Sequence, residues 1–178
     1  MEPLLQGEAF DDLFHTFNER AFHLEGQDTY RTPDETGPFR LFLDGQPDDF
    51  AWHEPWLTLV REVSGDSKGI TRVRVVTVPH ADYTRWGLTV APYNIAAGEE
   101  IRWLPRHLVD PHDLPADDFW LFDNDRVAFT VFEPDGRFAG GATTIDPTIV
   151  GYCRMVRDRV WQTAIPHSQY IVSEYVST

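Results

Sequence analysis

The sequence predicts a single α/β (α+β) domain, built on a mixed β-sheet flanked by helices. The β-branched run Ile70–Val78, bounded by Gly69 and Pro79, suits a central strand. Downstream, apolar runs separated by turn residues are typical of a C-terminal three-stranded meander. Segments of helical spacing occur before and after these strands, where they can cover the sheet.

The length and composition fit one domain. The chain has 178 residues, of which 42% are hydrophobic and 13% aromatic, enough for one hydrophobic core. We expect residues 1–178 to form a single domain without a linker. Within it, residues 8–66 should form a helical N-terminal part with one strand, and residues 67–178 the sheet core and the closing helix.

The first part of the chain is expected to be mainly helical. Residues Glu8–Asn18 are predicted to form a helix, because their large apolar residues recur at the spacing of one face: Phe10, Leu13, Phe14 and Phe17. The alternation in Arg20–Gln27 predicts a strand. The next elements expected are a short helix, a loop, a helix and a turn, around Phe39–Leu43, Asp48–His53, Pro55–Val63 and Ser64–Gly69.

The central strand is followed by a helix and a second strand. Alternation divides the central strand between Val73 and Val75 on one face and Arg72, Arg74, Val76 and Val78 on the other. A helix is predicted over Ala81–Ala96, where Pro92 should kink or end it and Gly98 should stop its last turn. The following strand is expected at Glu100–Leu104.

The meander and the closing helix complete the predicted domain. Its strands are expected at Phe119–Phe122, Arg126–Phe132 and residues 137–145, with turns at Asn124–Asp125 and Pro134–Gly136. The helix should span Asp146–Ala164, with Asp146 as its N-cap, Pro147 at its first position and Pro166 beyond its end. Its buried face is predicted to carry Ile149, Cys153, Val156, Val160 and Ala164.

The charge argues against several classes of partner, and the sequence shows no targeting or membrane-spanning segment. A formal net charge of −14 argues against direct nucleic-acid binding through phosphate contacts and against binding to anionic membranes. The N-terminus has no basic region followed by an apolar run, so no signal peptide is expected, and no apolar stretch approaches the length of a membrane span. We therefore expect a cytoplasmic protein. The single cysteine excludes an internal disulfide.

No catalytic or metal-binding motif identifies a reaction. The seven histidines form no HExxH, the one cysteine forms no CxxC, and the glycines form no GxSxG, GxGxxG or P-loop. His107 and His112 lie close to acidic residues, but we interpret this segment as a solvated loop. Cys153 is interpreted as a core residue. We predict no metal and no cofactor, and the catalytic residues are unknown.

An arginine–aromatic cluster is the candidate binding site for a small anionic ligand. Its residues lie on or just after the central strand and the next strand: Arg72, Arg74, Tyr83, Arg85, Trp86, Arg102, Trp103 and Arg106. Arginine forms bidentate hydrogen bonds with carboxylates and phosphates and stacks on aromatic rings. The alternative is that these arginines pair with some of the 29 acidic residues while the tryptophans fill the core.

Four blocks carry a resemblance to a known family. They are FDDLFHTFNERAFHLE, VRVVTVPHADYTRW, NIAAGEEIRWLPR and DFWLFDNDRVAFTVFEPDGRF, in this order between about Phe10 and Tyr170. This arrangement resembles an actinobacterial family of small acidic domains of unknown function, often encoded beside helix-turn-helix regulators. The resemblance implies a single cytoplasmic domain with a regulatory role, and no catalytic residues are established for that family.

The second half is also similar to sensor domains of the phospholipase D-like fold. The likeness rests on a strand, a long helix, the EIRWLPR strand, the DFWLFDNDRV hairpin and a closing helix with Trp161. The catalytic His-x-Lys pattern of that superfamily is missing, because the only lysine, Lys68, has Asp66 two residues before it. The resemblance therefore implies a binding module without hydrolytic chemistry.

Three functions remain open from the sequence. The first is a non-catalytic regulatory or ligand-sensing module that acts with a helix-turn-helix DNA-binding regulator. The second is an enzyme of unrecognised type, in specialised metabolism, that holds an anionic substrate through an arginine–aromatic pocket of Arg72, Arg74, Tyr83, Arg85 or Arg102. The third is a toxin–antitoxin or defence component.

Overall fold

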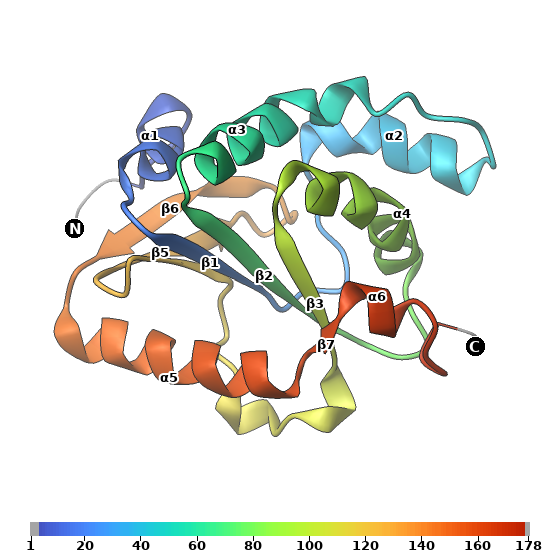
Figure 1. Cartoon of the computed structure of the whole chain (residues 1–178). Helices are drawn as coiled ribbons and strands as arrows, with labels where there is room; N and C mark the ends of the chain where they lie inside the picture. The colour runs from blue at the N-terminus through green and yellow to red at the C-terminus, as the bar shows by residue number, and fades with distance from the viewer. Residues whose placement is uncertain (1–3, 177–178) are drawn as a thin grey trace.

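A seven-stranded mixed sheet lies between two layers of helices in the computed structural model, which describes residues 4–176 (Figure 1). The strand order is β6-β5-β4-β1-β2-β3-β7. The strands are β1 (Arg20–Glu25), β2 (Gly69–Val76), β3 (Glu100–Pro105), β4 (Phe119–Phe122), β5 (Arg126–Phe132), β6 (Phe138–Thr144) and β7 (Ile165–Pro166). This confirms the predicted α+β class.

The sheet has a parallel centre and antiparallel sides. Strand β2 pairs in parallel with β1 and with β3, as expected for a strand that is apolar on one face throughout. Strands β4, β5 and β6 form the predicted meander beside β1. The two-residue strand β7 pairs with β3 at the other edge. It was not predicted, because two residues carry no recognisable alternation.

One group of helices lies on one side of the sheet, and one long helix lies on the other (Figure 1). The first group is α1 (Glu8–Thr16), α2 (Pro33–Leu43), α3 (Glu54–Gly65) and α4 (Asp82–Ala97), and the opposite face is covered by α5 (Pro147–Thr163). The short elements are α6 (His167–Tyr170) and the 3₁₀ turns η1 (Ala51–His53), η2 (Arg106–Leu108) and η3 (Pro111–Asp113).

Helix α5 packs on a wholly apolar core. The predicted N-cap of α5 is confirmed, since the side chain of Asp146 accepts hydrogen bonds from the backbone N–H groups of Thr148 and Ile149. Its buried face differs from the prediction at one position: Val150 is buried, whereas Ile149 is 39% exposed, because the helix is rotated slightly relative to the expected stripe. Cys153 is fully buried in this core, and burial raises the pKa of its thiol to about 11.

Helix α4 continues through the proline that was expected to kink or end it. Pro92 lies inside the helix, which reaches Ala97 before Gly98 adopts a left-handed φ of 118°. A proline removes one backbone hydrogen bond. Burial of Ala91 and Asn94 on either side of it holds the helix in place, so tertiary packing outweighs the local signal.

Two further boundaries differ from the prediction. Helix α2 begins at Pro33, six residues before the predicted start. The prediction missed its first turns because Gly37 and Pro38 interrupt the apolar pattern there. The β4–β5 turn has Asp123 and Asn124 at positive φ, so the turn lies one residue earlier than expected.

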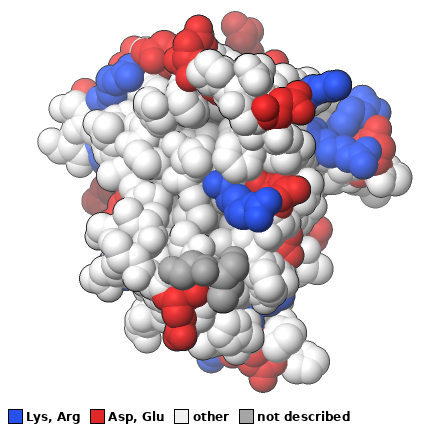
Figure 2. Space-filling view, turned by 90° about the vertical axis from the view of Figure 1, so that its right-hand side faces the viewer, with Lys and Arg blue, Asp and Glu red and all other residues white. Residues whose placement is uncertain are grey.

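Charged side chains are sparse on one side of the molecule. Figure 2 views the side of α2, α4 and α6, where uncharged residues occupy most of the face and charged ones lie mainly towards its margins. Large apolar side chains of these helices are partly exposed, such as Leu43 and Tyr93. Of the helices between residues 4 and 176, none has the length and apolar character needed to cross a membrane.

Candidate functional site

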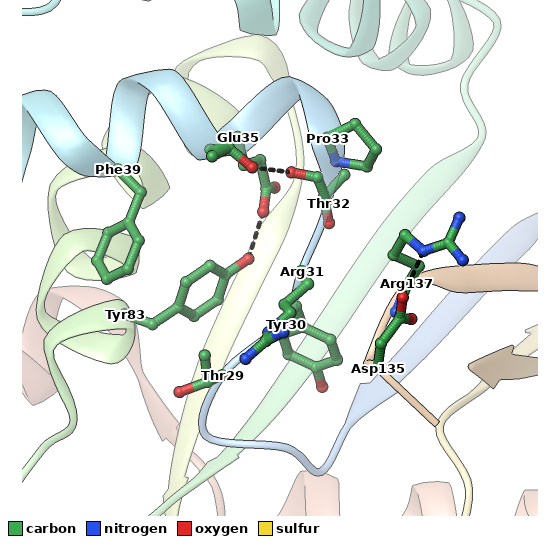
Figure 3. A pocket seen from close by; sticks show the side chains of 11 residues that line it. Thr29, Tyr30, Arg31, Thr32, Pro33, Glu35, Phe39, Tyr83, Asp135 and Arg137 are labelled. Carbon is green, nitrogen blue, oxygen red and sulfur yellow. Dashed lines mark hydrogen bonds and ion pairs between the residues drawn. The ribbon is translucent and has the colours of Figure 1, made fainter. Parts of the chain in front are cut away.

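Two adjoining cavities open on the side of the sheet that carries α1, α3 and α4. The main cleft has a volume of about 450 Å³, with a floor formed by β1, β2, β4 and β5. The neighbouring cavity, of about 440 Å³, is lined by the segment Thr29–Pro33, by α2 and by the β5–β6 turn (Figure 3). Both cavities are bordered by Tyr30, Thr32, Glu35 and Tyr83, which therefore lie between them.

The cleft floor is polar because two adjacent strands direct charged residues to the same face. Alternation in β1 places His23 and Glu25 on this face, and β2 contributes Arg72 and Arg74. The parallel register sets His23 beside Arg72 and Glu25 beside Arg74. The intervening residues of both strands face α5 and are apolar.

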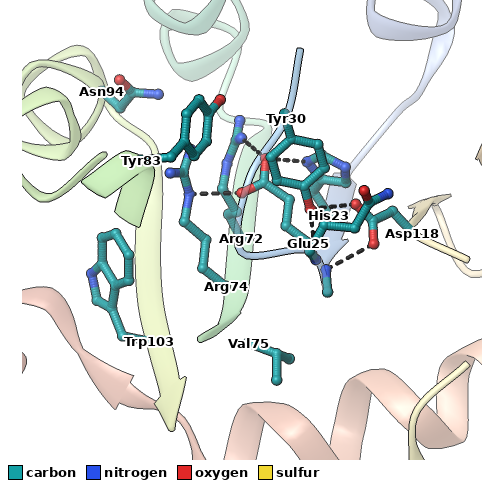
Figure 4. A network of polar contacts seen from close by, with 12 residues as sticks. His23, Glu25, Tyr30, Arg72, Arg74, Val75, Tyr83, Asn94, Trp103 and Asp118 are labelled. Atoms are coloured by element: carbon teal, nitrogen blue, oxygen red, sulfur yellow. Dashed lines mark hydrogen bonds and ion pairs between the residues drawn. The ribbon is translucent and has the colours of Figure 1, made fainter. Parts of the chain in front are cut away.

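Four charged groups at the centre form a buried ion-pair network, of which Figure 4 shows Glu25, Arg72 and Arg74. Arg72 Nη1 lies 2.5 Å from Glu25 Oε1, and Arg72 Nε lies 2.6 Å from Glu99 Oε1. Arg74 Nε lies 2.7 Å from Glu25 Oε2. Burial alone would raise the pKa of Glu25, but Arg72 and Arg74 outweigh it and lower this pKa to about 2. Glu25 is therefore ionised at neutral pH.

Helices α3 and α4 complete the partners of Glu99. Its Oε2 accepts hydrogen bonds from Asn94 Nδ2, at 2.7 Å, and from Trp56 Nε1, at 3.1 Å. Since Asn94 donates through its nitrogen, its oxygen accepts from His53 Nε2, at 2.6 Å. This fixes the proton of the His53 ring on Nε2 and links the buried charges to the cleft wall.

His23 is the least satisfied polar group of the cleft. Its ring stacks on Trp120, with centroids 4.0 Å apart, and Nδ1 lies 3.5 Å from Glu25 Oε1. Among the described residues, neither Nδ1 nor Nε2 has a hydrogen-bond partner. Burial lowers the pKa of His23 to about 3, so the ring is neutral. Because Nδ1 is the nitrogen that faces the carboxylate, we assign the ring proton to it on electrostatic grounds, which makes Nε2 a buried acceptor that lacks a donor.

Two tyrosine–carboxylate pairs border the cleft. Tyr30 Oη donates to Asp118 Oδ2 at 2.5 Å, and the N–H of Gly26 donates to Asp118 Oδ1 at 2.7 Å. Tyr83 Oη donates to Glu35 Oε2 at 2.5 Å. Burial raises the pKa of Asp118 to about 6 and also raises that of Glu35. Both carboxyl groups are thus easier to protonate than exposed ones.

The structure brings together half of the predicted site residues. Arg72, Arg74, Tyr83 and Trp86 line the cleft. The alternative interpretation also applies to the first two, since both arginines pair with acidic residues. Nη1 and Nη2 of Arg74 nevertheless form no hydrogen bond within residues 4–176, so this guanidinium keeps free donors.

The other four predicted residues lie outside the cleft. Arg85 is on the exposed side of α4, where it pairs with Asp82. Arg102 stacks on Trp161 of α5, on the opposite sheet face, because side chains alternate along β3. The remaining two have structural roles: Trp103 is buried beneath Arg74 and bonded to His167, and Arg106 donates to the carbonyl oxygens of Gly26 and Val75.

Several cleft residues were absent from the prediction. They are His23, Glu25, Tyr30, Glu35 and Asp118, together with Glu99, which does not line the cleft but pairs with Arg72 of its floor. The signal for the first two was present in the alternation of β1, where polar side chains share a face and alternate with Phe22 and Leu24. Glu35, Glu99 and Asp118 lie in separate elements, and only the fold brings them together.

Known metal-site arrangements are not found in the described part of the chain. Within residues 4–176, no group of three or more histidine, cysteine, aspartate or glutamate side chains could hold a metal ion. In the predicted loop, Asp110 caps η3 and Asp113 pairs with Arg159 of α5.

Comparison with known proteins gives a family without an assigned activity. No curated protein has a significantly similar sequence. The family model DUF6879, a domain of unknown function, matches residues 8–172, which includes every strand and all the cleft residues described above. The prediction of an unknown-function domain family is thereby confirmed, and the chain belongs to the DUF6879 family.

Proposed function

We propose that this domain is a non-catalytic ligand-sensing module, which binds a small molecule in the cleft and acts with a helix-turn-helix DNA-binding regulator in the cytoplasm. One observation carries the proposal: the sheet buries paired charges and the unpartnered His23 around a cavity of about 450 Å³. Apolar residues of similar size would stabilise the fold as well or better. Cavities of this size with a few convergent polar groups are typical of small-molecule sites.

The regulator as partner is supported by resemblance and by charge. The actinobacterial family that the chain resembles is often encoded beside such regulators. The similarity to phospholipase D-like sensor domains, without the His-x-Lys motif, favours binding over hydrolysis. A net charge of −14 complements the basic surface of a DNA-binding protein.

A thermal-shift screen with small molecules and with the neighbouring regulator tests this function. A ligand at 100 times its dissociation constant should stabilise the domain by about 2.7 kcal/mol. Gly87 lines the cleft, and a Cβ there would lie 2.6 Å from Arg74 Nη1. Gly87→Leu should therefore abolish stabilisation by a small molecule. If neither small molecules nor the regulator raise the melting temperature, the proposal is wrong.

An enzymatic role is a second candidate, favoured by one pair of groups. The neutral ring of His23 and the carboxyl of Asp118, with a pKa of about 6, line the same cleft. A carboxyl group with a pKa near neutral pH is suited to general acid–base catalysis, and the neutral His23 ring of the same cleft can hydrogen-bond a substrate. Conversion of a bound compound into product, lost in His23→Phe and in Asp118→Asn, would favour this role over sensing.

A further inference from the structure

The central network of the cleft is balanced in charge. Two guanidinium groups, those of Arg72 and Arg74, face two carboxylates, those of Glu25 and Glu99. His23 is neutral and adds no charge. The charges of the floor are thus satisfied within the protein, and the floor as a whole does not require a counterion from the ligand.

Four further carboxylates line the cleft and form no ion pair among the described residues, and two of them, Glu35 and Asp118, are not exposed, unlike Asp11 and Asp34. Glu35 receives its hydrogen bond from Tyr83, and Asp118 from Tyr30 and from a backbone N–H. Arg74 is near enough to lower the pKa of Glu35 but forms no ion pair with it. Asp118 is only 4% exposed. Buried negative charge without a cation is costly, and a bound cation would offset that cost.

Aromatic rings and a hydrogen-bond acceptor face the same space. Trp52 and Trp86 are stacked with centroids 5.5 Å apart, and the ring of Tyr83 meets Trp86 edge-on at 5.3 Å. All three line the cleft, as does His23, which is 8% exposed and whose Nε2 acceptor lacks a donor. Aromatic faces attract cations, and a vacant acceptor requires an N–H or O–H donor.

Resting on the proposed ligand-binding function, we propose that the ligand is an organic cation, a protonated amine with an aromatic body. Glu35 and Asp118 hold its ammonium group, and the tryptophan and tyrosine rings contact its body. His23 Nε2 accepts a further N–H from it. The competing class is an anion held by the free Nη atoms of Arg74, so the test must compare opposite charges on the same body.

Three indole compounds provide this comparison on the full chain by isothermal titration calorimetry. Tryptamine carries a positive charge, indole-3-acetate a negative charge and 3-methylindole none. Phenethylamine and phenylacetate repeat the comparison on a smaller ring. We expect each amine to bind at least about tenfold more tightly than the matched acid. The neutral compound should bind with intermediate affinity, through ring contacts alone.

Isosteric variants locate the charge that the amine contacts. Glu35→Gln and Asp118→Asn should each weaken tryptamine binding by about tenfold and leave 3-methylindole binding unchanged. Glu62→Gln is the matched control, because Glu62 is an exposed glutamate of α3 that does not line the cleft. Circular dichroism and thermal unfolding of each variant establish that it is folded before binding is compared.

The remaining outcomes distinguish failure of the cationic-ligand proposal from failure of ligand binding in the cleft. Equal or tighter binding of the acids, lost in Arg74→Met, would overturn the cationic ligand and leave the proposed function standing. Amine binding that survives both carboxamide variants would overturn the assignment of Glu35 and Asp118. Absence of binding by amines, acids and the neutral ring alike would overturn this inference, and the thermal-shift screen would then decide the ligand-binding function by itself.

Discussion

The two faces of the sheet differ in chemistry although the same strands supply both. Strand β1 turns Phe22 and Leu24 towards α5 and His23 and Glu25 towards the cleft. Strand β2 does the same with its valines and its arginines. The α5 face forms a continuous apolar core, whereas the cleft face buries charges around open space.

This difference indicates which face holds the fold and which face is available for function. Apolar burial contributes to stability wherever it occurs, whereas a buried ion pair gains little over apolar residues of the same volume. The α5 core and the apolar cluster under α1 and α3 bury the apolar side chains of the sheet. The charged residues of the cleft add little stability in comparison, which supports the ligand-binding function proposed above.

Removing the central guanidinium should have the largest effect on stability. Arg72→Met leaves Glu99 buried without a cation and Glu25 with Arg74 alone, and we expect the free energy of unfolding to fall by about 3–5 kcal/mol. The matched change on the other face, Arg102→Met, should cost about 1 kcal/mol or less, because its partner Glu100 is largely exposed. Urea unfolding measures both. Equal losses would show that the network is no more critical than a surface pair.

Truncation in the α5 core should affect stability but not the cleft. Leu104 is fully buried on that face, so Leu104→Ala should lower the free energy of unfolding by about 3 kcal/mol. Its side chain does not line the cleft, and the affinity for any cleft ligand should stay within about twofold of wild type. Denaturant unfolding and calorimetry check the two parts. A large loss of affinity would mean that the two faces are energetically coupled.

The sequence predicts the α5 face better than the cleft face, for a physical reason. β-branched alternation, turn residues and the Asp146 cap are local signals, and they predicted β2, the meander and α5. The cleft depends on register between distant segments. Glu25 and Arg72 are far apart in the chain and meet only because β1 and β2 pair in parallel.

The alternation of side chains along the strands also explains why only part of the predicted arginine–aromatic cluster lies in the cleft. Arg72 and Arg74 were correctly assigned to one face of β2, since a period of two can be seen in a single strand. The faces of β2 and β3 can be related only through their register, which places Trp103, not Arg102, beside Arg74. Tertiary packing likewise carried α4 through Pro92, against its local signal.

His23 should make the cleft face sensitive to acid. Its pKa is about 3 in the folded protein and 6.5 ordinarily, so between these values the unfolded state binds the extra proton. Stability is therefore lost as the pH falls from about 6.5 towards 3, by up to about 1.4 kcal/mol per pH unit. His23→Phe keeps a ring against Trp120 but cannot titrate. The free energy of unfolding, measured with urea at pH 7, 6 and 5, should depend less steeply on pH in this variant than in the wild type. Equal pH dependences would contradict the lowered pKa of His23.

Asp118 should have the opposite sign and the smallest effect. Its pKa is about 6 when folded and 3.8 ordinarily, so the folded state holds the proton more tightly, and stability is lost as the pH rises from about 3.8 to about 6 and stays lower above that. Asp118→Asn removes that cost, and its amide can still accept from Gly26 N–H while its nitrogen faces the Tyr30 hydroxyl. We expect the free energy of unfolding to rise by on the order of 1 kcal/mol at pH 8, a gain that disappears towards pH 4.

The same variant should bind amines more weakly, so a gain in stability with a loss of affinity would mark Asp118 as a residue kept for binding. A loss of stability at pH 8 would show instead that its two hydrogen bonds outweigh the cost of the buried charge.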